Sequence, residues 1–507
     1  MYGFSGRYNT SNNLWYNASG GFVYYAAAVG VVYTADAENK AQVGRQKFFL
    51  KHDNDITCIA AHPSRDIFAT GQQQSSARTR RPLEPPTKGR PYVYIWDSET
   101  RMGPDGRKQP VRLELPVEDK EVGCVAFSRR PLGHGAKDDK AGDLLLTVAR
   151  DAKHTIRVWH WKQDAEKCTA SGEGMHGTPP QVFGAVWNEW GKEETTGHRS
   201  DFVTFGVQHI TFWEYSDSVE RDGKFEARLS QKSAQFGRGV SGSPQKHDVL
   251  CVCYLPTGHV LAGYENGSVA IFDHPRANAD MDGGHGEMVR QRALAKKEGG
   301  DALVSQLKQK RSLKTVAVQE ILHAHKAAVK VEPGSDEGQW GYKWGGCTAL
   351  VLAAANDVIF SGGGDGRIIE WRLGMAGLAG DEVPLSNLRH GMVDDTGGSD
   401  ILTPRRVFDA RVIDSTGPPR MFVGLDTRDN GTERYICAGD TENDIWQITQ
   451  RGKDFNECHY AEGEGNHEDF KFELEGQSDS VFGIAPFPVK IVHTGEVSPL
   501  LLLSIRH

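Results

Sequence analysis

A short strand–turn–strand unit recurs along this 507-residue chain. In its clearest copy, SGGGDGRIIEW at Ser361–Trp371, a turn rich in glycine and aspartate lies between two strand-like stretches, and the second ends on an aromatic residue. Related copies are LTVARDAKHTIRVWHW (Leu146–Trp161), VTFGVQHITFWEY (Val203–Tyr215), LAGYENGSVAIFD (Leu261–Asp273) and ICAGDTENDIWQIT (Ile436–Thr449), with a shorter one, YVYIWD, at Tyr92–Asp97. Such a unit cannot bury its apolar face alone and needs neighbours. The repeat therefore constrains the fold more strongly than any single motif.

Aromatic residues that end the second strand mark the phase of the repeat. They stand at Tyr33, Trp96, Trp159, Phe212, Phe272, Trp371 and Trp446. All are more widely spaced than the roughly 40–45 residues of a typical propeller repeat, so the units carry long loops.

An alternating apolar strand precedes most of these markers. Its copies are DITCIAAHP (Asp55–Pro63), EVGCVAFSR (Glu121–Arg129), QVFGAVWNE (Gln181–Glu189), DVLCVCYLP (Asp248–Pro256), GCTALVLAA (Gly346–Ala354) and SVFGIAPFP (Ser480–Pro488). Period-two alternation that ends on a turn residue predicts a half-buried strand. Together the two series predict an all-β, WD40-type β-propeller of about seven blades.

The two ends of the chain each carry part of a unit. The last copy, at Ser480–Pro488, is followed by LLLLSIRH without the expected turn and aromatic strand, whereas residues 22–36 resemble a strand pair without a partner. Closure of the ring removes exposed strand edges. We therefore expect the N-terminal strands to complete the last blade, the alternative being an incomplete blade in a fragment of a longer chain.

Three long insertions interrupt the blades expected over residues 51–507. They cover about residues 72–90, 274–320 and 373–403, and the second contains the one convincing helix candidate, GEMVRQRALAKKEGGDALVSQLKQKRSLK. Long loops in a compact array are usually functional or disordered. These insertions are the places where a partner would be expected to bind.

Charge and composition exclude several classes of partner. The formal net charge of −8 argues against nucleic acid bound through bulk positive charge. No apolar run is long enough to span a bilayer, and no signal peptide precedes the first repeat. Eight cysteines are too sparse for a disulfide framework, which favours buried free thiols in the cytoplasm.

The motifs of catalysis and ligand binding are weak throughout the chain. The glycines of residues 362–366 lie between two strands, so a hairpin turn is favoured over a phosphate loop. His323-Ala-His325 could chelate a metal, but its apolar neighbours suggest an outer strand. Asp394-Asp395 has no partner base. We expect no enzyme activity, no cofactor and no metal.

Four tryptophans of the repeat have a structural interpretation. Trp96, Trp159, Trp371 and Trp446 recur at equivalent places and are expected to pack between blades rather than contact a ligand.

The chain resembles the echinoderm microtubule-associated protein-like (EMAP-like) family. YGFSGR and NNLWYNASGGFVYYAAAVGVVY are similar to the hydrophobic HELP motif of that family, and KHDNDITCIAAHPSRDIFATGQ with YVYIWDSET is similar to its first WD-type repeat. CVAFS, VFGAVWNE, VLCVCYLPTGHVLAGYENGSVAIF and VIFSGGGDGRIIEW keep the family's order. The resemblance covers about residues 2–507 and is most specific at the N-terminus.

This resemblance implies a fold, a partner and a location. It implies a propeller that includes a HELP-type strand pair within residues 1–50, and binding to tubulin or microtubules. The sequence departs from the family in having no N-terminal coiled coil and no second propeller. Compact relatives without the coiled coil occur in cilia, which implies a role beside neighbouring proteins of the ciliary or flagellar axoneme, a cytoskeletal location.

Basic residues in two insertions are the candidate contacts with acidic tubulin. Complementary charge would steer such binding and make it sensitive to salt. The first group is Arg78, Arg80, Arg81, Lys88 and Arg90, and the second is Arg290, Arg292, Lys296, Lys297, Lys308, Lys310 and Arg311. The alternative is that these exposed loops are charged only for solubility.

Two functions remain open at this point. The first is a non-enzymatic structural protein of the microtubule lattice, a component of axonemal doublets. The second is a general WD-repeat scaffold or adaptor that assembles a soluble protein complex. The HELP-like N-terminus favours the first.

Overall fold

The computed structural model describes residues 4, 12–34, 45–75, 89–99, 109–128, 142–177, 182–189, 199–221, 224–233, 247–255, 259–272, 317–321, 324–327, 329–330, 342–343, 345–353, 358–373, 402–410, 421–451 and 470–474. Nearly all of them are strands and the turns between strands. The single helical element within these ranges is a 3-10 turn at Val117–Asp119. The helix expected in the 274–320 insertion lies outside the described residues.

The described strands form seven four-stranded antiparallel sheets, each built from strands that are consecutive in the chain. The first three sheets are β1–β4 (Trp15–Tyr16, Phe22–Ala26, Val29–Thr34, Arg45–Phe49), β5–β8 (Ile56–Ala61, Ile67–Gln72, Tyr92–Asp97, Val111–Glu114) and β9–β12 (Val122–Phe127, Leu145–Ala149, Ile156–Trp159, Ala170–Gly172). The next two are β13–β16 (Val182–Trp187, Arg199–Gly206, His209–Arg221, Lys224–Ser233) and β17–β20 (Val249–Tyr254, Val260–Tyr264, Val269–Phe272, Ala317–Ile321). The last two are β23–β26 (Cys347–Leu352, Val358–Gly363, Arg367–Leu373, Leu402–Asp409) and β27–β30 (Phe422–Asp429, Glu433–Asp440, Ile445–Arg451, Phe470–Leu474), and a separate pair joins β21 (Val329–Lys330) to β22 (Tyr342–Lys343).

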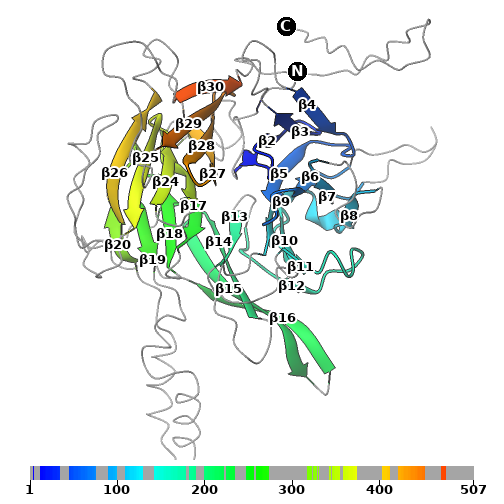
Figure 1. The fold of residues 1–507 in the computed structure, drawn as a ribbon. Coiled ribbons are helices and arrows are strands. Elements are labelled where there is room, and N and C mark those ends of the chain that lie inside the picture. Colours follow the sequence, from blue (N-terminus) through cyan, green and yellow to red (C-terminus); the bar gives the residue numbers. More distant parts are fainter. Residues whose placement is uncertain are drawn as a thin grey trace, which may run out of the picture.

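These sheets are the blades of a propeller, which confirms the predicted fold class. Figure 1 shows β5, β9, β13, β17 and β27 near the centre of the ring and β4, β8, β16, β20 and β26 at its rim. All seven aromatic markers lie on the third strand of a blade. The five alternating stretches between Asp55 and Ala354 form the first strands β5, β9, β13, β17 and β23. The second-to-third turn of blade six fits its predicted hairpin, since Gly366 has a φ of 72°, which favours glycine.

Ring closure differs from the expected exchange of strands. The N-terminal strands form a complete blade of their own, β1–β4, and the last described blade, β27–β30, is four-stranded without them. Its first strand is Phe422–Asp429, a segment that the alternation pattern missed because Asp426 and Arg428 interrupt it. The predicted strand at Ser480–Pro488 lies outside the described residues.

Apolar packing joins the first blade to the last. Phe4, Leu14, Tyr16 and Tyr24 are buried in one cluster with residues of the last blade, Val423, Cys437 and Ile445. The Phe4 ring meets Tyr24 edge-on at 6.0 Å between centroids. Packing of apolar side chains therefore joins the first blade to the last described blade, where an exchange of strands was expected.

Blade four carries a feature that the sequence pattern did not reveal. Its third strand, β15, has 13 residues and pairs with the 10-residue β16 as far as Arg221 and Lys224. In Figure 1 this hairpin extends beyond the other blades. No helix among the described residues is long and apolar enough to cross a membrane.

Candidate functional site

The first strands of the blades begin on one face of the propeller, which we call the entry face. The end of blade two's second strand meets the start of the next blade, because Gln73 bridges Glu121 just before β9. Likewise the amide of Gln208, after β14, donates to Asp248 Oδ1, just before β17, at 3.2 Å. Second-to-third connections therefore lie on the entry face, and third-to-fourth connections leave from the opposite, exit face.

The two basic segments leave the ring on opposite faces. Residues 72–90 connect β6 to β7, a second-to-third connection, so they leave from the entry face. The insertion expected at 274–320 is the connection from β19 to β20, and its last residues, from Ala317, belong to β20 itself. This third-to-fourth connection leaves from the exit face, as does the connection between β25, which ends at Leu373, and β26, which begins at Leu402. The described ends of the two segments therefore lie on opposite faces of the ring.

Arg90 is the one candidate contact that falls within the described residues. Its side chain is 52% exposed, and its Nη1 lies 3.0 Å from Glu114 Oε1 on the outer strand β8. An exposed ion pair contributes at most about 1 kcal/mol, so it does not hold Arg90 away from a partner. The remaining candidates lie outside the described residues: Arg78, Arg80, Arg81, Lys88, Arg290, Arg292, Lys296, Lys297, Lys308, Lys310 and Arg311.

The most complete polar cluster links the buried His325, which lies in the connection between blades five and six, to three buried side chains of blade six. His325 Nε2 and Trp371 Nε1 both lie 2.8 Å from Ser361 Oγ. His325 Nδ1 lies 2.9 Å from Asp365 Oδ1, and Arg367 binds the other oxygen, Oδ2, through Nε at 2.8 Å. His325, considered in the sequence as half of a chelating pair, is instead engaged through both ring nitrogens with Asp365 and Ser361 of blade six.

The groups that contact Asp365 keep its carboxyl group ionised. Burial by itself raises the pKa of this carboxyl, but the adjacent His325 and Arg367 outweigh burial and hold the pKa below its usual range. The cluster joins the second-to-third turn to the strands beside it.

Blade two repeats this arrangement with one replacement. His52 Nε2 lies 2.7 Å from Thr70 Oγ1, which also accepts a hydrogen bond from Trp96 Nε1 at 3.1 Å. Gln72 takes the place of the aspartate, with its Oε1 2.7 Å from His52 Nδ1. Burial lowers the pKa of His52 to about 4, so the ring is neutral at pH 7.

All four tryptophans selected from the sequence are buried, with at most 3% of each residue exposed. Trp159 Nε1 donates to Thr147 Oγ1 at 3.0 Å. Trp446 has a different kind of acceptor, since it donates to a carboxylate oxygen, Asp440 Oδ2, at 2.9 Å. Across the β28–β29 pair it lies directly opposite Ala438.

In blade four the equivalent ring is Trp213, one residue beyond the marker Phe212, and it donates to Thr204 Oγ1 at 2.9 Å. Because Phe212 and Trp213 are adjacent aromatic residues, the sequence pattern alone did not show which of them makes this hydrogen bond.

A buried ionic network lies where blade six meets blade seven. Glu370, fully buried on β25, has its Oε1 3.1 Å from Arg405 Nη1 and its Oε2 3.7 Å from Arg406 Nη1. Gln450 of the last blade donates to Glu370 Oε2 at 2.7 Å. Sequence reasoning missed this network, because charged residues on a third and a fourth strand ordinarily face solvent.

The described polar clusters connect strands and blades to one another. Among the described residues no group of three or more histidine, cysteine, aspartate or glutamate side chains is placed to hold a metal ion. The chemistry available at these clusters is that of hydrogen-bonded, buried packing.

The family model that matches this chain and the known proteins that resemble it point to the same family. The family model described as the echinoderm microtubule-associated protein first beta-propeller matches residues 45–334. Echinoderm microtubule-associated protein-like 2 of Rattus norvegicus is 27% identical over 309 residues, which cover 59% of this chain and 36% of that protein. Echinoderm microtubule-associated protein-like 3 of Homo sapiens is 26% identical over 385 residues, 76% of this chain and 34% of that protein. The chain thus spans about a third of the length of these relatives.

Among solved structures, the WD40 repeats of RRP9 align with a TM-score of 0.43 and 12% sequence identity. The alignment covers 85% of this chain and 87% of that one.

Proposed function

Because the chain belongs to the echinoderm microtubule-associated protein-like family, we propose that it is a non-enzymatic structural protein that binds tubulin or the microtubule lattice. The match of residues 45–334 to the family's first propeller is the observation that carries the proposal. The curated relatives are named as microtubule-associated proteins, which supports microtubules as the partner.

The propeller would act as a rigid frame that presents irregular segments to the lattice. Buried tryptophans and ionic networks fix the blades, while the long connections between strands leave from the two faces. Residues 72–90 are the first candidate segment, since five basic residues stand there against one acidic residue, Glu84. An acidic tubulin surface would attract them, and salt would screen the attraction.

Separate charge reversals test each face of the propeller. In one variant Arg78, Arg80 and Arg81 become glutamate, and in a second Lys296, Lys297 and Lys308 become glutamate. Each variant is sedimented with microtubules at low and at moderate salt. We expect a loss of pelleting in at least one variant, and because the segments leave on opposite faces, the more affected variant identifies the contacting face.

A matched control separates local contact from overall charge. Lys153, Lys167 and Lys326 are exposed outside both segments, so their joint reversal to glutamate changes the net charge by the same amount. The control is expected to pellet like the unmodified chain. Equal behaviour of all three variants at low salt would remove both segments from the proposal.

The finer part of the proposal is a place in the ciliary or flagellar axoneme, beside other axonemal proteins. It rests on the family resemblance of the N-terminal segment and is tested independently by tagging the chain in ciliated cells. Signal along the axoneme supports it, whereas signal confined to cytoplasmic microtubules overturns this part and leaves microtubule binding intact. Recovery in a soluble complex without tubulin would favour the adaptor function.

A further inference from the structure

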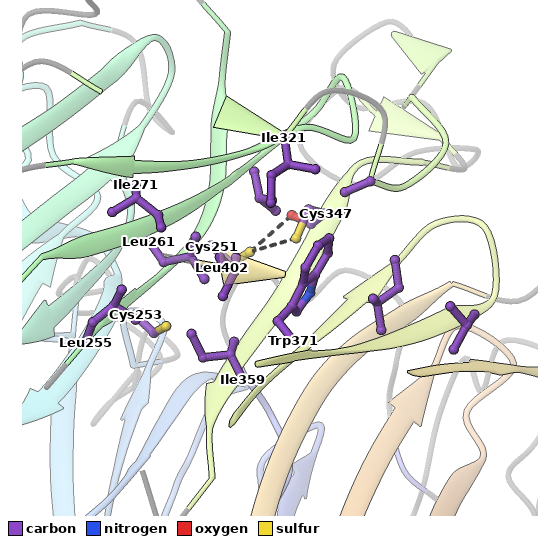
Figure 2. Packing of buried hydrophobic residues seen from close by; sticks show 14 residues of the cluster. Cys251, Cys253, Leu255, Leu261, Ile271, Ile321, Cys347, Ile359, Trp371 and Leu402 are labelled. Carbon is purple, nitrogen blue, oxygen red and sulfur yellow. Dashed lines mark hydrogen bonds between the residues drawn. The ribbon is translucent and has the colours of Figure 1, made fainter. Parts of the chain in front are cut away.

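Two cysteines from neighbouring blades face each other at the junction of blades five and six. Cys251 lies on the first strand β17 and Cys347 on the first strand β23, and their sulfur atoms are 3.8 Å apart. Figure 2 shows the two thiols side by side within the apolar cluster that also contains Trp371 and Ile321. Cys251 Sγ also lies 3.1 Å from the carbonyl oxygen of Cys347.

The absence of a side chain at Gly263 makes this close approach possible. A methyl group placed on Gly263, which pairs with Cys251 across β17 and β18, would lie 2.5 Å from Cys347 Sγ and 2.7 Å from Cys251 Sγ. Both thiols therefore occupy the space above one glycine. They are held together by the packing of two blades although 96 positions separate them in the chain.

The junction of blades two and three has the same arrangement with one thiol. A methyl group on Gly71 would lie 2.8 Å from Cys58 Sγ and 2.6 Å from Val122 Cγ1. Val122 thus takes the place of Cys347, and Cys58 has no thiol opposite it at that position. The junction of blades two and three therefore serves as an internal control, in which the same packing contains one thiol instead of two.

We propose that Cys251 and Cys347 form a redox-sensitive pair that a peroxide oxidises to a disulfide, joining blade five to blade six covalently. Cys251 is the more accessible of the two, with 8% of the residue exposed against 0% for Cys347. Its thiolate attacks hydrogen peroxide, which leaves a sulfenic acid on Cys251 and releases hydroxide, and this takes up a proton to become water. The Cys347 thiol then displaces the sulfenic hydroxyl as a second water, so two electrons pass from the two sulfurs to the peroxide.

Burial makes this oxidation slow and dependent on pH. The thiol of Cys251 is buried, and this raises its pKa well above the ordinary value, with the neighbouring Cys347 adding to the rise. Because the thiolate is the reacting species, the rate should rise by about tenfold per pH unit below that pKa. In a reducing compartment the dithiol is the resting state, and the bridge would form only under sustained oxidation.

Peptide mapping after oxidation of the full chain tests the pair. The purified chain is treated with hydrogen peroxide, digested with trypsin without reduction and analysed by mass spectrometry. We expect a cross-linked pair of peptides, residues 247–276 with residues 344–367, that has lost two hydrogens and separates on reduction with dithiothreitol. Cys251 and Cys253 share the first peptide, so the same cross-link in a Cys253→Ala variant assigns the bridge to Cys251.

Two further variants keep the proposal open to contradiction. Cys347→Val reproduces the arrangement around Val122, so it should fold and lose the cross-link. Val122→Cys should gain a second bridge, from Cys58, at the junction of blades two and three. The proposal is overturned if oxidation leaves Cys251 and Cys347 unlinked in a folded chain, or if Cys251 forms its disulfide with another cysteine instead.

Discussion

Asp426 of the last blade accepts two hydrogen bonds from Arg65 of the second blade, from Nη1 at 2.6 Å and from Nη2 at 3.1 Å. The same carboxylate accepts the amide of Tyr16 in the first blade at 2.8 Å. Three blades thus meet at one side chain that has no exposed surface, whereas Arg65 keeps 28% of its side chain exposed. Closure of this ring depends on a buried ion pair as well as on apolar packing.

Removal of Asp426 should weaken the ring closure. Asp426→Ala leaves the Arg65 guanidinium without its carboxylate and the Tyr16 amide without its acceptor. Breaking a buried pair costs about 3–5 kcal/mol, and partial exposure of Arg65 places the expected loss near the lower end. Urea unfolding measures it, and a double-mutant cycle with Arg65→Ala separates the coupling from each single loss. A coupling energy of zero would show that the pair does not hold the blades.

Trp371→Ala should destabilise the chain by about 3–5 kcal/mol, because the fully buried ring leaves a cavity between strands. Trp371→Phe keeps most of the apolar surface and loses the hydrogen bond to Ser361 Oγ, so the free energy of unfolding should fall by about 1 kcal/mol. Chemical unfolding of both variants compares the two contributions. A thermal melt of Trp371→Ala that matches the unmodified chain would contradict the packing role.

Stability should fall as the pH drops from about 6.5 to about 4. Burial lowers the pKa of His52 to about 4, while an unfolded histidine titrates near 6.5. The unfolded state binds more protons in this window, so the stabilisation is present above about pH 6.5 and is lost toward pH 4, by about 3 kcal/mol for His52. Burial also lowers the pKa of His209 to about 4, which adds to the same loss.

A pH series of urea unfolding tests this prediction. His52→Gln removes the titrating group and should reduce the slope of stability against pH between about 4 and 6.5. An unchanged slope in His52→Gln would assign the acid sensitivity to other groups.

Much of the fold could be predicted from local pattern. Third strands such as that of Trp371 were recognisable because an aromatic residue follows a turn with fixed chemistry, Asp365-Gly366. First strands such as Ile56–Ala61 alternate between buried and half-buried positions at their start. The strand at Phe422–Asp429 escaped recognition because its pattern treats Asp426 as an exposed charge. Asp426 is instead buried by contacts with Arg65 and Tyr16, which lie 361 and 410 positions away in the chain.

The candidate site could be predicted only in part. Charge composition identified the basic segments at 72–90 and 274–320, but the faces from which they leave follow from strand order, which composition does not encode. The pairing of Cys251 with Cys347 likewise depends on Gly263 and on contact between blades. Both features arise from tertiary packing between distant segments.

Sedimentation of the purified full chain with microtubules over a range of salt concentrations tests directly whether it binds the lattice. We expect saturable pelleting at low salt that declines as the ionic strength rises. A folded chain that stays in the supernatant with microtubules at every salt concentration would contradict it.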